Sequence, residues 1–186
     1  MKRFLFFTIL FLGLSCNSRY KWVDDLESKI KAYERSAQLQ EEEYQVNSGT
    51  STAIYITPYQ ERNGIRKTVF RHTRKGVMYF ERHIYFEGKD IVFEHHVGIA
   101  PRLVKEKDKV LKTSKYMIFD KNSFFKNDAV GKRFGQQKVI DKFIPKDSVQ
   151  SVLKKLTVDE SFLYKENYLE IKNYLKDITA LQRVEE

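Results

Sequence analysis

The stretch VMYFERHIYFEGKDIVFEHHV, residues 77–97, decides the fold class of this chain. Apolar and polar residues alternate on both sides of the tetrapeptide Glu87–Asp90, which contains a glycine suited to a tight reversal. Because successive side chains of a strand point to opposite faces, a period of two is the mark of a pleated strand. The stretch therefore predicts two antiparallel strands, Val77–Phe86 and Ile91–Val97, joined by a short turn.

Two more hairpin turns precede this stretch. Asn63–Gly64 is a strong signal for a two-residue hairpin turn, and Gly76 suits a second one. They delimit predicted strands over residues 52–59 and 67–73. Pro58 places the first of these at a sheet edge, because proline cannot donate a backbone hydrogen bond to a neighbour.

The residues after 97 continue the pattern less regularly. TSKYMIFD (113–120) and SFF (123–125) predict one or two further strands. The polar residues 100–112 predict a loop, and GKRFG (131–135) predicts a basic turn. Residues 51–144 are therefore expected to form an antiparallel β-meander of about five or six strands.

Helical periodicity flanks the meander. Residues 20–45 predict a helix, because apolar residues recur every three or four positions: Trp22, Leu26, Ile30, Tyr33 and Ala37. After Pro145 the sequence predicts a short helix to about Leu156, then a capping box at Thr157–Glu160 that opens a longer helix. The fold class expected is α+β, with the N-terminal and C-terminal helices packed on one face of the sheet.

The composition is that of a globular protein with a basic surface. The chain has 186 residues, of which 41% are hydrophobic and 32% charged, with a formal net charge of +9. Three prolines and eight glycines argue against a long disordered linker. The positive charge suits anionic lipid or glycan partners, or it decorates a solvated surface.

The first eighteen residues, MKRFLFFTILFLGLSCNS, form a separate segment. Lys2 and Arg3 precede an apolar run over residues 4–14. A membrane span needs roughly 20 residues, so this run is too short to cross a bilayer and has the size of a signal-peptide core. The run leads into Gly13-Leu14-Ser15-Cys16, which holds the sole cysteine of the chain.

This segment resembles the lipobox of bacterial lipoproteins, in the relaxed form familiar from Bacteroidota and spirochaetes. Ser15 fits the pattern, whereas Gly13 and Leu14 stand where leucine and a small residue are common. The resemblance implies cleavage before Cys16 and lipidation of Cys16, and Asn17, which is not aspartate, implies the outer membrane. The alternatives are an ordinary signal peptide with an incidental cysteine and an uncleaved N-terminus.

The domain organisation follows from these segments. Residues 1–15 are the expected lipoprotein signal peptide, and residues 16–186 are expected to form one α+β domain. Within it, we expect the anchor and N-terminal helix at 16–50, the meander at 51–144 and the C-terminal helices at 145–186.

The four histidines all fall in the meander, which raises the hypothesis of a metal site. If Phe86 pairs with Ile91 and the register continues unbroken, Glu81, His83, Glu94 and His96 share one face of the sheet. Two imidazoles and two carboxylates are a ligand set for a divalent ion such as zinc. The alternative is ordinary cross-strand charge pairing, and a register slip of one residue would scatter the set.

No motif of a hydrolase, zinc protease or phosphate-binding loop is present in the sequence. No catalytic, cofactor-binding or metal-binding residue is therefore assigned, and lipidation of Cys16 is the one site prediction. The expected function is a membrane-anchored envelope lipoprotein that binds a protein, glycan or anionic lipid without catalysis and without nucleic acid. The alternative is an extracytoplasmic hydrolase or a metal-binding protein that uses the meander histidines.

Overall fold

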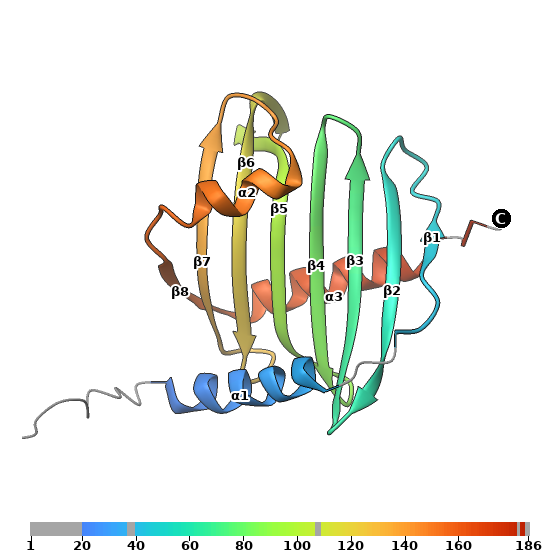
Figure 1. Ribbon diagram of the computed structural model, residues 1–186, viewed down its shortest axis with the longest axis vertical. Coiled ribbons are helices and arrows are strands. Elements are labelled where there is room, and N and C mark those ends of the chain that lie inside the picture. Colours follow the sequence, from blue (N-terminus) through green and yellow to red (C-terminus); the bar gives the residue numbers. More distant parts are fainter. Residues whose placement is uncertain (1–19, 37–39, 107–108, 182, 185–186) are drawn as a thin grey trace, which may run out of the picture.

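The computed structural model describes residues 20–36, 40–106, 109–181 and 183–184. Within these residues, eight strands each pair antiparallel with the next, so strand order in the sheet equals strand order in the sequence (Figure 1). The strands are β1 (Tyr44–Val46), β2 (Ala53–Arg62), β3 (Ile65–Arg74), β4 (Met78–Glu87), β5 (Asp90–Glu106), β6 (Lys109–Phe125), β7 (Gly131–Ile140) and β8 (Asp159–Leu163). The predicted α+β class and antiparallel meander are confirmed.

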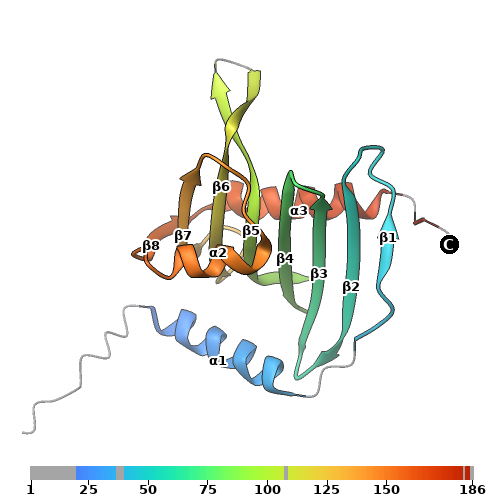
Figure 2. The same ribbon diagram turned by 45° about the horizontal axis from the view of Figure 1, so that its top comes forward.

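Helices cover both faces of this sheet. α1 (Lys21–Arg35) and α2 (Lys146–Leu153) lie in front of the strands in Figure 1, and α3 (Lys165–Thr179) crosses behind them (Figures 1 and 2). We call these two sides the α1 face and the α3 face. The prediction that all helices pack on one face is wrong, because the strands present apolar side chains on both faces and each face needs a cover.

The core accordingly divides into three clusters. On the α3 face, Ile84 and Phe86 of β4 pack in one cluster with Tyr168, Ile171 and Ile178 of α3. On the α1 face, Tyr85 and Phe93 pack in a second cluster, which includes four buried side chains of α1: Val23, Leu26, Ile30 and Tyr33. A third cluster joins α2 to β5 and β6 through Val149, Leu153, Ile99 and Ile118.

The hairpin turns form where glycine and asparagine predicted them. Asn63 and Gly64 both have positive φ angles, 52° and 76°, as a two-residue hairpin turn requires. β2 is, however, the second strand rather than the edge strand expected from Pro58. β1 pairs with Ile54–Ile56 and ends short of the proline, whose carbonyl accepts a hydrogen bond from the backbone of Glu41.

The predicted helix over residues 20–45 is shorter than expected. α1 ends at Arg35, where Ser36 takes an extended conformation and its hydroxyl donates to the carbonyl of Tyr33. Residues 44–46 form β1 instead of a helix end. Tyr44 and Val46 point to the α3 face, where Val46 is part of the core and Tyr44 packs against it, so tertiary packing decides their conformation.

The count of five or six strands is also too low. The predicted loop over residues 100–112 is part of the long β5–β6 hairpin, in which Val104 pairs with Leu111 and Glu106 with Lys109. This hairpin projects beyond the rest of the sheet in Figure 2. Residues 100–112 lack a regular alternation of apolar and polar side chains, so their pairing with each other, and no local pattern, makes them part of a strand.

The predicted basic turn GKRFG (131–135) is the first half of β7. Its glycines allow close approach of neighbouring backbone, because a Cβ at Gly131 would lie 2.6 Å from the carbonyl oxygen of Phe124. The predicted capping box at Thr157–Glu160 does not form either. Asp159–Leu163 is strand β8, and the Glu160 side chain bonds to Lys132 of β7 instead of a helix end.

α2 confirms the short helix expected after Pro145, and α3 begins at Lys165, later than predicted. No helix within the described segments is long and apolar enough to cross a membrane. Cys16 and the rest of the predicted signal peptide lie outside the described residues.

Candidate functional site

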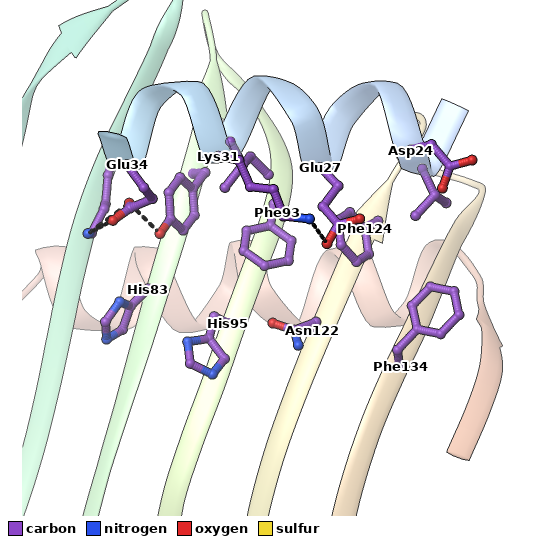
Figure 3. Close-up of a pocket in the computed structure, with 14 residues that line it drawn as sticks. Asp24, Glu27, Lys31, Glu34, His83, Phe93, His95, Asn122, Phe124 and Phe134 are labelled. Atoms are coloured by element: carbon purple, nitrogen blue, oxygen red, sulfur yellow. Dashed lines mark hydrogen bonds and ion pairs between the residues drawn. The ribbon is translucent and has the colours of Figure 1, made fainter. Parts of the chain in front are cut away.

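The β-sheet register aligns three rows of side chains across the α1 face. The central row, which we call the histidine row, consists of directly paired residues from β3 to β7: Val69, His83, His95, Asn122 and Phe134. Neighbouring strands lie about 4.8 Å apart, so the two imidazoles and the amide follow one another at that spacing. Figure 3 shows His83, His95, Asn122 and Phe134 in a line below α1.

The row next to it, under α1, is largely aromatic. Tyr85 pairs with Phe93, and Phe93 pairs with Phe124. The ring centroids of Phe93 and Phe124 are 4.7 Å apart, and all three side chains are buried. This row is apolar because α1 covers it with Val23, Leu26 and Ile30.

The row on the other side, toward α2, supplies a carboxylate to each histidine. His83 Nε2 lies 3.0 Å from Glu81 Oε2, and His95 Nε2 lies 2.8 Å from Asp120 Oδ1. The two imidazole rings are in edge contact, with centroids 5.4 Å apart. The sheet thus carries two parallel carboxylate–imidazole dyads on adjacent strands.

Residues of α2 and β4 hold the carboxylates from the opposite side. Lys146 Nζ lies 3.2 Å from Glu81, and Gln150 donates to Asp120 at 2.7 Å. The hydrogen bond from His83, followed by that from Tyr79 and by the charge of Lys146, lowers the pKa of Glu81 to about 2 despite its partial burial. Both contacts of α2 therefore help to keep the carboxylates ionised and fixed in place.

Burial alone would raise the pKa of Asp120. The hydrogen bonds with His95 and Gln150 outweigh that effect and lower the pKa below its usual value. Asp120, like Glu81, is therefore a carboxylate at neutral pH and accepts hydrogen bonds without donating any.

This arrangement fixes the tautomer of both histidines. Because the carboxylates only accept, Nε2 of His83 and of His95 must carry the proton, which leaves Nδ1 as an acceptor in the neutral ring. Neither Nδ1 has a hydrogen-bond partner among the described residues, and neither does the side-chain amide of Asn122. Three adjacent polar groups of the histidine row are thus available to bind a ligand.

A pocket of about 670 Å³ opens above this row, between α1 and the sheet. Its polar wall is formed by His83, His95 and Asn122 (Figure 3). Its apolar surface comes from Val23, Ile30, Tyr85, Phe93, Phe124 and Phe134. The volume falls within the range of small-molecule sites, and the lining combines a large apolar area with a few convergent polar groups.

Charged side chains stand at the rim of the pocket. α1 contributes Asp24, Glu27, Lys31 and Glu34, and β3 contributes Lys67. Glu34 accepts from Lys67 Nζ at 3.0 Å and from the Tyr85 hydroxyl at 2.8 Å, which ties the end of α1 to the sheet. The lining therefore holds three carboxylates and two ammonium groups, with the carboxylates of Glu81 and Asp120 behind the histidines.

A second polar cluster lies on the α3 face and is closed. Arg82 and Glu94 form a buried ion pair with an N–O distance of 2.5 Å. The guanidinium also lies over the ring of Tyr174, whose hydroxyl is 2.7 Å from His72 Nε2. α3 seals this cluster. One group in it, His96 Nε2, is buried without a hydrogen-bond partner in the described part of the chain.

The predicted four-residue metal set is wrong. Phe86 does pair with Ile91, but Tyr85 pairs with Phe93, so Val92 forms a β-bulge. The bulge moves Glu94 and His96 to the α3 face, away from Glu81 and His83. Across the residues that the structure describes, no three His, Cys, Asp or Glu side chains come together as a metal ion would require.

The sequence held a signal for this bulge. Ile91, Val92 and Phe93 are three consecutive apolar residues, which breaks a period of two, and all three are buried. Asp120 and Asn122 were not predicted as site residues: residues 113–120 and 123–125 were expected to form one or two strands, and no register with the preceding strand was inferred for them. In the single strand β6, Asp120, Asn122 and Phe124 are every second residue, so their side chains share one face of the sheet.

No protein-family model, curated protein or solved structure matches this chain. The fold and site define an α+β protein with a pocket between a helix and an antiparallel sheet, and the inference of function rests on the chain's own residues.

Proposed function

We propose that this chain is a lipid-anchored protein of the bacterial cell envelope that binds a small amphipathic molecule in the pocket between α1 and the sheet. One observation carries the proposal: Nδ1 of His83, Nδ1 of His95 and the amide of Asn122, which have no partner among the described residues, adjoin an aromatic surface within one pocket. A ligand that fills this space needs an apolar body and a compact polar head. The anchor is the lipid expected at Cys16.

The charges around the pocket favour a head group that donates hydrogen bonds. An imidazole that carries its proton on Nε2 can accept a hydrogen bond at Nδ1, and carboxylates outnumber ammonium groups in the lining. An anionic head would face Glu34 and Glu27 at the rim and the dyad carboxylates behind the histidines. A neutral, hydroxyl-rich head or an amine is therefore the class of ligand that this pocket suits.

Binding is favoured over catalysis by the kinds of side chain that line the pocket. None of the described lining residues is Ser, Thr or Cys, the residue types that serve most often as nucleophiles in acyl transfer. The dyads resemble general bases in form, and a hydrolase is therefore the alternative that the experiment must distinguish.

The test compares ligands that share a tail and differ in the head: hexyl glucoside, hexylammonium and hexanoate. The lipidated protein is reconstituted in phosphatidylcholine vesicles, and binding of radiolabelled ligand is measured by equilibrium dialysis against protein-free vesicles. We expect hexyl glucoside and hexylammonium to bind at least tenfold more tightly than hexanoate.

Variants of the histidine row complete the test. The double variant His83→Ala/His95→Ala should weaken binding of hexyl glucoside at least tenfold. Gln137→Ala is the matched control, because this exposed amide lies on the α3 face. Unchanged binding in the double variant would overturn the proposal, and hydrolysis of a nitrophenyl ester or glycoside that depends on His83 would replace it with a hydrolase.

The anchor is tested separately. Radioactive palmitate should label the wild-type chain and leave Cys16→Ala unlabelled. Equal labelling of both would place the lipid elsewhere, and no labelling of either would remove the anchor from the proposed function without affecting the pocket.

A further inference from the structure

We propose that the end of the domain at which α1 begins rests on the lipid bilayer, and that Phe162, Tyr164 and Val130 are the side chains that contact it. We call these three residues the apolar end. The inference rests on the proposed lipid anchor at Cys16, and it assigns a surface that neither the anchor nor the ligand pocket requires.

The length of the tether limits where the bilayer can lie. Cys16 is four residues before Tyr20, at which the described structure begins. An extended chain advances at most 3.6 Å per residue, so these four residues span about 14 Å. The start of α1 must therefore lie within about 14 Å of the acylated cysteine, and the side of the domain around Tyr20 must face the membrane.

The apolar end lies beside this point. The ring of Phe162 meets the ring of Tyr20 edge-on, with centroids 6.4 Å apart. Lys132 pairs with Phe162 and Gly131 pairs with Leu163, which brings Val130 next to Tyr164 at the same end of β7 and β8. Both views of the fold show β8 and the start of α1 on the same side of the molecule (Figures 1 and 2).

These side chains are among the exposed large apolar residues of the described chain. Phe162 is 57% exposed, Tyr164 63% and Val130 46%. β8 is the edge strand of the sheet, and no described helix or strand covers this end of it. Aromatic residues gather at the boundary between lipid head groups and hydrocarbon, where a partly polar and partly apolar ring is favoured.

Contacts of one lysine join the apolar end to the start of α1. Lys132 is buried between Tyr20 and Phe162, with Nζ 4.3 Å and 3.6 Å from the two ring centroids, and it forms an ion pair with Glu160. Lys132 thus joins the first turn of α1 to β8. The exposed charges nearby are of both signs, Lys126 and Lys165 against Asp128 and Glu166, so contact should not require anionic lipid.

This orientation places α1, which forms one wall of the ligand pocket, beside the bilayer. It points the projecting part of β5 and β6 away from the membrane, because these strands extend at the opposite end of the sheet from α1 (Figure 2). An amphipathic ligand released by the membrane would therefore emerge on the side of the domain that carries α1.

Trp22, the sole tryptophan of the chain, reports on this contact because it lies in the first turn of α1. The lipidated protein is reconstituted in zwitterionic phosphatidylcholine vesicles, with or without bromine atoms placed near the head-group end of the acyl chains. Bromine quenches tryptophan fluorescence at close range. We expect bromine to quench at least half of the Trp22 emission in the wild type.

The variant Phe162→Ser/Tyr164→Ser should lose most of this quenching while it remains bound to the vesicles. Val158→Ser is the matched control, since Val158 is 60% exposed but lies before the start of β8, away from the apolar end, and its quenching should equal that of the wild type. A wild-type chain that sediments with vesicles without quenching, or equal quenching in the double variant, overturns the proposed surface.

Failure of the anchor is recognised separately. A chain that takes no palmitate and does not sediment with vesicles removes both the anchor and this surface. Failure of ligand binding, measured by dialysis, affects neither.

Discussion

The two faces of the sheet carry similar side chains in opposite arrangements. On the α3 face, Arg82 and Glu94 neutralise each other under a helix, and His72 bonds to Tyr174. On the α1 face, Glu81 and Asp120 bind His83 and His95 on one ring nitrogen, and the other nitrogen has no partner in the described parts of the chain and lies beside a pocket.

The difference lies in how the covering helices sit. α3 packs along the α3 face and closes its polar groups, whereas α1 and α2 lie at opposite ends of the α1 face and leave the histidine row between them (Figure 1). Polar groups that are paired and buried contribute to stability, and polar groups that are unpaired beside a pocket are available to a ligand. The α3 face therefore has a structural role, and the α1 face carries the proposed binding site.

The largest expected effect comes from the buried ion pair. Glu94→Ala leaves the Arg82 guanidinium buried without its partner, which should lower the free energy of unfolding by about 3–5 kcal/mol. Urea denaturation measures this change. Glu81→Ala is the matched substitution on the α1 face, where the dyad is partly exposed, and we expect it to cost less than half as much. Equal losses on the two faces would contradict the comparison.

The next effect is a dependence of stability on pH that arises on the α3 face. Burial, followed by the charge of Arg82, lowers the pKa of His72 from 6.5 to about 4. The unfolded chain therefore takes up a proton between pH 6.5 and pH 4 that the folded chain does not, and stability falls as the pH is lowered through this window. The loss should reach about 3 kcal/mol.

His72→Phe should make this loss shallower, as measured by urea denaturation at pH 7 and pH 4.5. Part of the slope will remain, because burial also holds the pKa of His96 well below its usual value. An identical slope in the variant would show that His72 is charged or solvated in the folded protein.

The α1 face should respond in a more acidic window. The folded-state pKa of Glu81, about 2, lies below the ordinary value of 4.5, so its contribution to stability is complete above pH 4.5 and is lost as the pH falls toward 2. Glu81→Gln should flatten the stability curve in that window and leave the window from pH 6.5 to pH 4 unchanged. If the stability curve instead flattened between pH 6.5 and pH 4, the assignment of the lower pH window to Glu81 would be wrong.

The smallest effect separates two neighbouring residues of β6. Ser123 is fully buried on the α3 face and accepts a hydrogen bond from Arg133 at 2.9 Å, so Ser123→Ala should cost about 1–2 kcal/mol. Asn122 points to the pocket without a partner among the described residues, and Asn122→Ala should change stability by about 0.5 kcal/mol or less. Thermal unfolding measures both, and an equal cost would mean that Asn122 has a structural role.

The candidate site was only partly predictable from the sequence. His83 and Glu81 were predicted to lie together on one face, and they do. Glu94 and His96 were predicted to share that face, and this was wrong. The bulge at Val92, which buries three consecutive apolar side chains, shifts the register by one residue and turns both to the other face. Asp120 comes from a strand 25 residues beyond His95, and no local pattern couples two such positions.

Local sequence determined the hairpins and the short α2 helix, because Asn63–Gly64, Gly76 and Pro145 restrict the backbone directly. The leader with Cys16 is likewise predicted from neighbouring residues alone, and it stays a prediction. The tertiary structure decided β7, β8 and the end of α1. Close backbone approach at Gly131, the bond between Glu160 and Lys132, and the packing of Val46 depend on segments distant in the sequence. Which face each histidine occupies was decided in the same way, since a strand places its side chains by register with its neighbours.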